Sequence, residues 1–174
     1  MKSLFSKTVF FVIVLVALCF LLALTLYADE LATVVSVVNG DTLVIDCNGK
    51  RETIRLAGID APECRMSRQA EVESRQTGES LIEIASKGID AKRFLESMVK
   101  KGDVIVVAFD VETRTRGGGL LGYVYLSDGR MLNEIIVREG YARVIRIFPN
   151  VKYHDRLLHA YREARTFRRG LWKS

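Results

Sequence analysis

The sequence is poor in the residues that build zinc sites and disulfide frameworks, because its 174 residues include only three cysteines and two histidines. Only Cys47 and Cys64 follow the first 28 residues, and no histidine is spaced near them, which argues against a zinc site. The two thiols can pair in an oxidising compartment or stay free and partly buried, and the sequence leaves both alternatives open. Internal repeats and low-complexity tracts are absent, so neither a repeat protein nor a disordered chain is indicated.

The chain also lacks the length for two independent cores and a strong charge of either sign. Its 174 residues suit one ordinary domain with a short appendage. Beyond residue 28 there are 24 basic residues against 21 acidic ones. This small excess permits an anionic partner but does not by itself identify one.

One long hydrophobic run is present, over residues 8–27, and it is interrupted only by two threonines. Its length is enough for a helix to cross a bilayer. Two lysines precede the run and two acidic residues follow it, an order that keeps the amino end in the cytoplasm and carries the rest across. We expect residues 1–28 to be a cleaved signal peptide or an uncleaved signal anchor. The domain over residues 31–174 is then extracytoplasmic, and it is secreted, periplasmic or held at the membrane through residues 8–27.

Short strands and hairpin turns dominate the rest of the chain. Turn signals at Asn39–Asp41 and Asn48–Gly49 join the first three strands into a meander. The predicted strands cover residues 31–38, 42–47, 53–59, 104–109 and 121–126. The predicted helices cover residues 90–99, a short segment from 132 to 139 and a last segment before Gly170, with one more short helix within 65–87. This α+β, mainly β pattern favours a five-stranded OB-fold barrel with about three helices.

The acidic residues of most interest stand where strands end. Asp41 lies at the tip of the first hairpin and Asp60 at the end of the third strand, so the two carboxylates converge if the meander pairs as predicted. Carboxylate oxygens with backbone carbonyls and water suit a hard cation such as Ca²⁺. Glu63 follows on a turn fixed by Pro62 and is placed to act as a general base through a water. Arg55, on the same strand as Asp60, can bind a phosphate through two hydrogen bonds.

A metal, a base and a guanidinium together describe phosphodiester hydrolysis. Taken singly, each residue also has a structural explanation. Asp41 is an ordinary turn residue, Arg55 can pair with a surface acid, and Glu63 can cap a helix.

The segments Asn39–Thr42 and Arg55–Glu63 resemble, in order and in spacing, those of the staphylococcal nuclease (thermonuclease) family. The resemblance continues along nearly all of residues 31–174, through the segments Val107–Asp110, Leu121–Tyr125, Asp128–Glu134, Gly140–Ala142 and Gly170–Trp172. It implies an OB-fold nuclease that uses Ca²⁺ to cleave DNA and RNA and leaves 3′-phosphate ends. We expect such a protein to act on nucleic acid as a monomer.

Position by position, the resemblance implies that Asp41 and Asp60 are metal ligands, together with the backbone carbonyl of Ala61. Arg55 matches the first phosphate-binding arginine of the family, and Glu63 matches its general base. Both assignments agree with the chemistry expected of these residue types.

The sequence departs from the family at the second catalytic arginine, because Gly119 stands at that position. We expect Arg116 to replace it, since the three glycines that follow make the loop pliable. The alternative is that Arg114 and Arg116 only add positive charge near the nucleic acid. Arg146 stands where the family can carry a tyrosine that contacts the nucleotide, and we expect it to bind a phosphate of the substrate.

The leading prediction is therefore an exported, Ca²⁺-dependent nuclease of DNA, RNA or both. The alternative is a catalytically weakened OB-fold module that binds nucleic acid or a protein partner, for which Gly119 is the argument. A membrane-tethered structural protein without a ligand is a third hypothesis, and only residues 8–27 support it.

Overall fold

The computed structural model describes residues 11–16 and 29–173 of the chain. Apart from residues 11–16, which are helical, the predicted signal or anchor segment of residues 1–28 lies outside the described residues. Within those two described ranges, no helix combines the length and the hydrophobicity that a membrane crossing needs.

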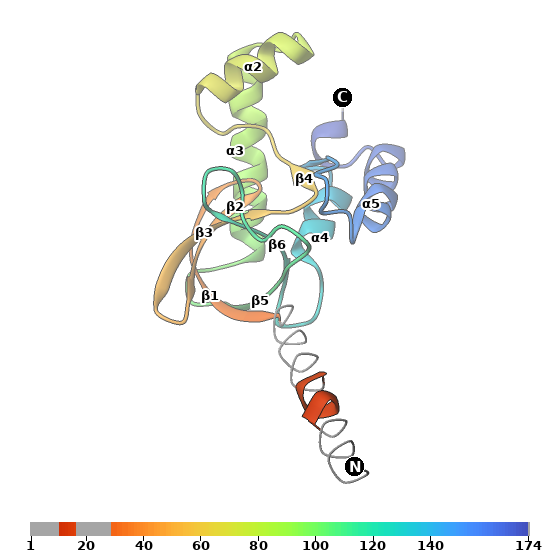
Figure 1. Ribbon diagram of the computed structural model, residues 1–174. Coiled ribbons are helices and arrows are strands. Elements are labelled where there is room, and N and C mark those ends of the chain that lie inside the picture. Colours follow the sequence, from red (N-terminus) through yellow and green to blue (C-terminus); the bar gives the residue numbers. More distant parts are fainter. Residues whose placement is uncertain (1–10, 17–28, 174) are drawn as a thin grey trace, which may run out of the picture.

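Five strands close into a barrel, as the sequence predicts for an OB fold (Figure 1). Around the barrel their order is β1-β2-β3-β6-β5, and every neighbouring pair is antiparallel except β3 with β6. The strands are β1 (Glu30–Asn39), β2 (Thr42–Cys47), β3 (Lys50–Leu56), β5 (Val104–Ala108) and β6 (Leu120–Tyr125). Their inward side chains form one hydrophobic core with the inner faces of the helices.

A second, two-stranded sheet lies outside the barrel and was not fully predicted. The third predicted strand, residues 53–59, is broken because Gly58 adopts a left-handed φ of 77°, which turns the chain. β3 therefore stops at Leu56, and β4 (Ile59–Asp60) pairs with β7 (Arg143–Val144) instead. This break places Asp60 on β4, beside a strand from the carboxyl-terminal half of the chain.

Residues 29–173 contain four α-helices, of which the first, α2, is the short helix expected within residues 65–87, and a closing 3₁₀ helix. They are α2 (Arg68–Thr77), α3 (Leu81–Met98), α4 (Leu132–Arg138), α5 (His154–Thr166) and η1 (Gly170–Trp172). α3 begins well before the predicted residue 90, because Ser80 and Glu83 form a capping box at its start. As Figure 1 shows, α3 runs from the barrel to α2, while α4 and α5 lie together on the other side.

An ion-pair network fastens α5 to α4. Glu134, buried at the start of α4, pairs with Arg138 and with Arg156 of α5, and Arg138 also reaches Glu163 of α5 at 3.3 Å. Burial raises the pKa of Glu134, but the hydrogen bond from Arg156 and the charge of Arg138 outweigh it and leave the pKa lowered. Glu134 is therefore held ionised, and three of the arginines of this region serve structure: Arg138, Arg156 and Arg169, which pairs with Glu163.

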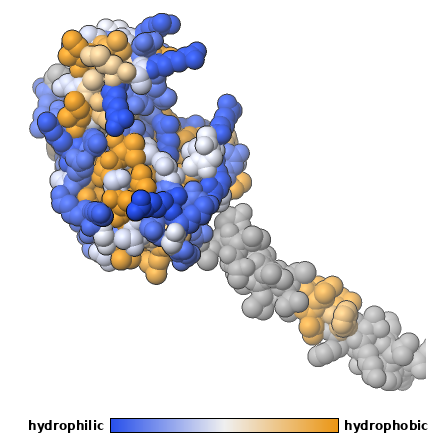
Figure 2. All heavy atoms as spheres, turned by 90° about the vertical axis from the view of Figure 1, so that its left-hand side faces the viewer, coloured by the Kyte–Doolittle hydropathy of each residue, from blue (hydrophilic) through white to orange (hydrophobic). Residues whose placement is uncertain are grey.

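The face of the molecule shown in Figure 2 is mainly hydrophilic, with separate hydrophobic areas towards the α2 end and over the barrel. The exposed apolar residues of the α2–α3 region include Met66, Val72 and Ile82. Scattered exposed apolar residues are usual in folded proteins, so they do not by themselves identify an interface.

Candidate functional site

The first hairpin places Asp41 at the centre of the site. Asn39 pairs with Thr42 across the hairpin, which leaves Gly40 and Asp41 as a two-residue turn. The Asp41 side chain is buried and accepts hydrogen bonds from the Thr42 hydroxyl at 2.7 Å and the Ala61 backbone N–H at 3.3 Å. Burial raises the pKa of Asp41, and the charge of Arg55 partly offsets that effect. The hairpin thus fixes the Asp41 carboxylate in a buried position, where its ionised form is stable only beside a positive charge.

Arg55 joins the two predicted metal-binding carboxylates. It lies on β3 directly opposite Thr42 of β2. Its Nη2 donates to Asp60 Oδ1 at 2.6 Å and lies 3.4 Å from Asp41 Oδ2. Because one nitrogen reaches both carboxylates, Asp41 and Asp60 face each other, as the sequence predicts. The Nε of Arg55 is buried and has no acceptor among the described residues, so the guanidinium keeps an unused donor.

Helix α3 supports the segment that carries Ala61 and Glu63. A Cβ atom added to Gly88 would lie 2.3 Å from the carbonyl oxygen of Glu63 and 2.5 Å from the amide nitrogen of Cys64. One turn further, Ala91 packs against Gly40, where an added Cβ would lie 2.6 Å from the Ala91 Cβ. The small residues of α3 therefore let the Gly40 turn and the Glu63–Cys64 segment lie directly on the helix.

Glu63 lies in a cavity of about 550 Å³ between β4 and α2, which Asp60 and Ala61 also line. Burial raises the pKa of Glu63, and the charge of Asp41 raises it further, with Arg55 acting in the opposite direction. A carboxylate with a raised pKa is a stronger base than an exposed glutamate, which suits the role predicted for Glu63.

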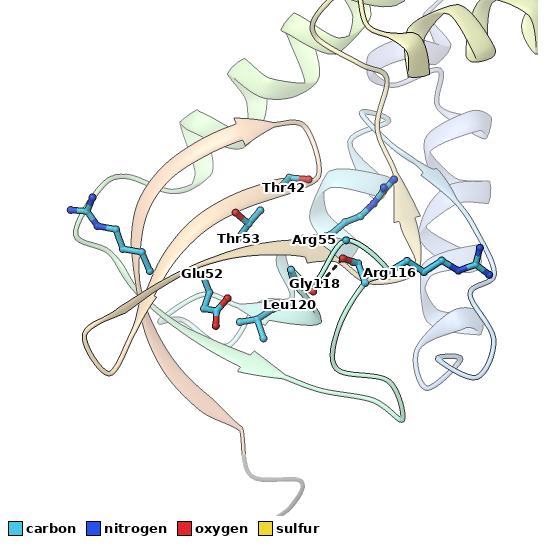
Figure 3. Close-up of a pocket in the computed structure, with 11 residues that line it drawn as sticks. Thr42, Glu52, Thr53, Arg55, Arg116, Gly118 and Leu120 are labelled. Carbon is cyan, nitrogen blue, oxygen red and sulfur yellow. Dashed lines mark hydrogen bonds between the residues drawn. The ribbon is translucent and has the colours of Figure 1, made fainter.

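A second cavity, of about 770 Å³, opens on the other side of Arg55 (Figure 3). Arg116 and Gly119 line it with Arg55, so the loop does reach the site. In Figure 3, however, the side chains of Arg55 and Arg116 leave their backbones in different directions, and their guanidinium groups do not meet. The loop is also closed by hydrogen bonds, including that from the Thr115 N–H to the Gly119 carbonyl at 2.8 Å, so it is less pliable than its glycines suggest.

The neighbouring Arg114 has a structural role, since it pairs with Glu52 at 3.1 Å and donates to the Gly118 carbonyl. Arg116 has no ion pair within the part of the chain that the structure describes. Of the two arginines of this loop, Arg116 is therefore the one whose guanidinium is available to an anionic ligand.

Other predicted residues lie apart from this centre. Arg146 is exposed, lines neither of the two cavities, and stacks its guanidinium over Phe148 at 5.5 Å. Cys47 and Cys64 are both free thiols, so the structure favours the second of the two alternatives that the sequence left open.

The oxygen atoms of Asp41, Asp60 and Ala61 are donors that suit Ca²⁺ better than a softer metal. Across residues 11–16 and 29–173, no group of three or more His, Cys, Asp or Glu side chains is close enough to hold an ion. Asp41 and Asp60 supply two facing carboxylates, and the backbone carbonyl of Ala61 follows Asp60 directly. Oxygen donors of this kind, completed by water and substrate, are those that Ca²⁺ prefers. The bridging guanidinium of Arg55 already shows that this pair of carboxylates is stabilised by positive charge.

The sequence analysis missed Arg143 and Glu73. Arg143 is the cross-strand partner of Asp60 and lines the Glu63 cavity, where Glu73 of α2 also lies. The pKa of Glu73 is raised, because burial outweighs the opposite effect of the Arg143 charge. The signal for Arg143 was its place directly after the segment Gly140–Ala142, but only the β4–β7 pairing brings it to Asp60.

Comparisons with known proteins give independent information on what this chain is similar to. A family model described as staphylococcal nuclease homologue matches residues 53–174. A thermonuclease of Staphylococcus hyicus is 28% identical over 146 residues, which cover 84% of this chain and 78% of the relative. An uncharacterized protein of Methanocaldococcus jannaschii, MJ1439, is 34% identical over 80% of this chain and 70% of its own. Endonuclease YncB of Bacillus subtilis is 29% identical over 78% of this chain and 58% of its own length.

Proposed function

Because the chain belongs to the staphylococcal nuclease family, we propose that it is a nuclease that hydrolyses phosphodiester bonds of DNA or RNA with the help of Ca²⁺. The observation that carries the proposal is the convergence of Asp41 and Asp60 on the Arg55 guanidinium, with Glu63 on the adjoining segment. The family match and the names of the thermonuclease and endonuclease relatives support the same activity.

Each residue has a defined task in this proposal. Asp41, Asp60 and the Ala61 carbonyl would hold Ca²⁺, which when bound withdraws charge from the phosphate under attack. Glu63 accepts the proton of the attacking water, for which its raised pKa suits it. Arg55 leaves its bridge between the carboxylates for the phosphate oxygens and stabilises the negative charge that builds up on them. The expected products carry 3′-phosphate ends, as in the family.

A second candidate function is supported by Gly119, which stands where the family has its second catalytic arginine. Loss of such a donor costs about 3 kcal/mol of transition-state stabilisation, or roughly a hundredfold in rate. A domain weakened in this way would bind nucleic acid or a protein partner without cutting. The complete set of Asp41, Arg55, Asp60 and Glu63 favours the nuclease, because a pure binding module has no need of a half-buried base and two facing carboxylates.

Removal of the metal is the direct test of the proposed function. The full chain in a mild detergent is expected to degrade single-stranded DNA with Ca²⁺ and to stop when a chelator is added, since Asp41 and Asp60 then repel the phosphate. Fragment length on a denaturing gel gives the rate, and 3′-phosphate ends are read from resistance to 3′-exonuclease. Degradation that continues in chelator would disprove the metal role, and binding without degradation in either condition would establish the binding module.

Substitution of Arg116 tests whether it takes over from the missing arginine. We expect Arg116→Ala to lower the cleavage rate by about a hundredfold, the usual effect of losing one transition-state donor. The matched control is Arg93→Ala, which removes an exposed guanidinium from α3, away from both cavities. Equal rates for Arg116→Ala and the parent would show that Arg116 only adds positive charge to the loop.

We also propose that the domain is exported, on the strength of residues 8–27 and the charges on either side of them. Fractionation of producing cells, with the intact mass of the recovered protein, distinguishes a cleaved signal peptide from a retained anchor. Recovery of the uncleaved chain from the cytoplasm would contradict export.

A further inference from the structure

A third cavity, of about 320 Å³, lies between α3, β7, α5 and the closing helix η1, and we call it the basic cavity. Its lining is dominated by cationic side chains that come from three distant parts of the sequence. They are Lys87, Arg143, Arg165 and Arg168, which lie with the carboxylate of Glu79 and the ring of Trp172. Neither the predicted metal-binding carboxylates nor Arg55 or Glu63 belongs to this group, which shares Arg143 with the cavity around Glu63.

The positive charge of this cavity is largely unpaired. Lys87 is neutralised by Glu79, whose carboxylate accepts its hydrogen bond at 2.6 Å. Arg143, Arg165 and Arg168 have no carboxylate within ion-pair distance in the part of the chain that the structure describes. This differs from Arg138, Arg156 and Arg169 of the α4–α5 network, each of which has a carboxylate partner. Three guanidinium groups that line one cavity without an ion-pair partner favour an anionic ligand there.

One of these arginines, Arg165, is held in place by its surroundings. The Arg165 guanidinium lies over the rings of Trp172 and Tyr161, 5.5 and 5.9 Å from their centroids. Such cation–π contacts restrict a long side chain before a ligand arrives. A side chain held in this way loses less conformational entropy when it binds an anion.

Arg143 connects this cavity to the catalytic centre. It lines both the basic cavity and the cavity that contains Glu63, and it lies directly opposite Asp60 in the β4–β7 pair. Because Arg143 borders both cavities, an anion in the basic cavity would be the neighbour, along one strand, of a phosphate bound by Arg55 and the metal site. A repeating polyanion such as a nucleic-acid strand satisfies this arrangement, whereas a single small anion would leave the connection unused.

We propose that the basic cavity is a second phosphate subsite, in which Arg143, Arg165 and Arg168 hold the backbone of a single-stranded substrate away from the bond that is cut. The inference rests on the proposed nuclease function and extends it to the substrate, which must be longer than the two nucleotides around the cleaved bond. Such a multi-nucleotide site agrees with the roughly 4 to 16 nucleotides that one OB fold covers. The contact is to phosphate, so it adds affinity without selecting a base sequence.

The test compares Arg165→Gln/Arg168→Gln with the parent and with Arg162→Gln/Lys173→Gln. The control pair removes two exposed charges from the same end of the chain, outside the cavity. Binding of fluorescent single-stranded DNA of about 2 and about 12 nucleotides is measured in chelator at several salt concentrations, with the full chain in a mild detergent. Each phosphate contact to a single strand contributes about 0.7 to the slope of log K against log salt.

We expect the cavity variant to lose about tenfold or more in affinity for the longer strand and about 1.4 in slope, while its binding of the dinucleotide is unchanged. The control pair should behave as the parent does. Equal affinity and slope for the cavity variant and the control would overturn the proposal. The proposal would also be overturned if the cavity variant lost the binding of inorganic phosphate but kept the parent's affinity for the longer strand. Cleavage by the parent with Ca²⁺ is scored separately, so failure of the nuclease function is distinguishable from failure of the subsite.

Discussion

Replacement of Glu63 by glutamine is expected to lower the rate of nucleic-acid cleavage by about 10²- to 10⁴-fold, the usual contribution of a general base. Glutamine keeps the shape of the side chain and can hold a water by hydrogen bond, but it cannot accept the proton. The initial rate of oligonucleotide cleavage with saturating Ca²⁺ measures the effect. Affinity for the same oligonucleotide in chelator should be retained, because Asp41, Arg55 and Asp60 are untouched.

The pH dependence of the parent enzyme gives an independent measure of the same residue. Burial and the neighbouring Asp41 raise the pKa of Glu63 above the ordinary 4.5 of a glutamate. As a base Glu63 must be ionised, so the rate should show an acidic limb, falling as the pH falls through the pKa of Glu63 in the Ca²⁺-loaded enzyme, where the charge of the ion acts against this rise. In Glu63→Gln this limb should disappear from the residual rate. Persistence of the same acidic limb in Glu63→Gln would contradict the assignment.

Stability separates the loss of a base from the loss of the fold. A carboxyl group whose pKa is raised on folding binds protons more tightly in the folded state, so its ionisation lowers the free energy of unfolding as the pH rises through that pKa. Glu63→Gln removes this ionisation, and the variant should be at least as stable as the parent at neutral pH. Glu71→Gln is the control, because Glu71 is exposed on α2 and lines no cavity around Glu63. Equal rates for Glu63→Gln and Glu71→Gln would show that another group takes the proton.

The parts of the site that lie on local signals were predictable from the sequence. Asn39–Asp41 specifies a hairpin turn. The meander that it begins pairs Thr42 with Arg55, and this pairing brings Asp41, the residue before Thr42, close to Arg55. The barrel followed from five short strands with hairpin connections, and the family resemblance assigned the roles. These predictions depend on contacts between residues that are close in the sequence, where pattern and turn chemistry have most influence.

The parts that depend on long-range packing were not predictable in the same way. Asp60 was placed at the end of the third strand, but the left-handed turn at Gly58 transfers it to β4 and opposite Arg143. The pairing joins residues more than eighty positions apart, and no local pattern encodes it. The short helix expected within residues 65–87 corresponds to α2, but the early start of α3 was not predicted, although Ser80 and Glu83 form a capping box there.

The same long-range packing makes Gly88 a sensitive position, although it lies in a helix and carries no chemistry. Helix propensity alone predicts that Gly88→Ala stabilises the protein by about 1 kcal/mol. The contact predicts the opposite sign, because the new Cβ would lie 2.3 Å from the Glu63 carbonyl and that obstacle is backbone, which cannot rotate away. We therefore expect a loss of about 1–3 kcal/mol in the free energy of unfolding, typical of an overpacked contact.

The larger effect of Gly88→Ala should be on catalysis. The variant can fold only by moving the Glu63–Cys64 backbone away from α3, and a displacement of about 1 Å in a catalytic group costs roughly a hundredfold in rate. Chemical denaturation and the cleavage rate under folded conditions separate the two effects. Ser86→Ala, an exposed substitution on the same helix, is the control and should leave both unchanged. A more stable Gly88→Ala with the parent's rate would show that Glu63 does not depend on its contact with α3. A folded Gly88→Ala variant with a hundredfold lower rate would show that Gly88 of α3 sets the position of Glu63.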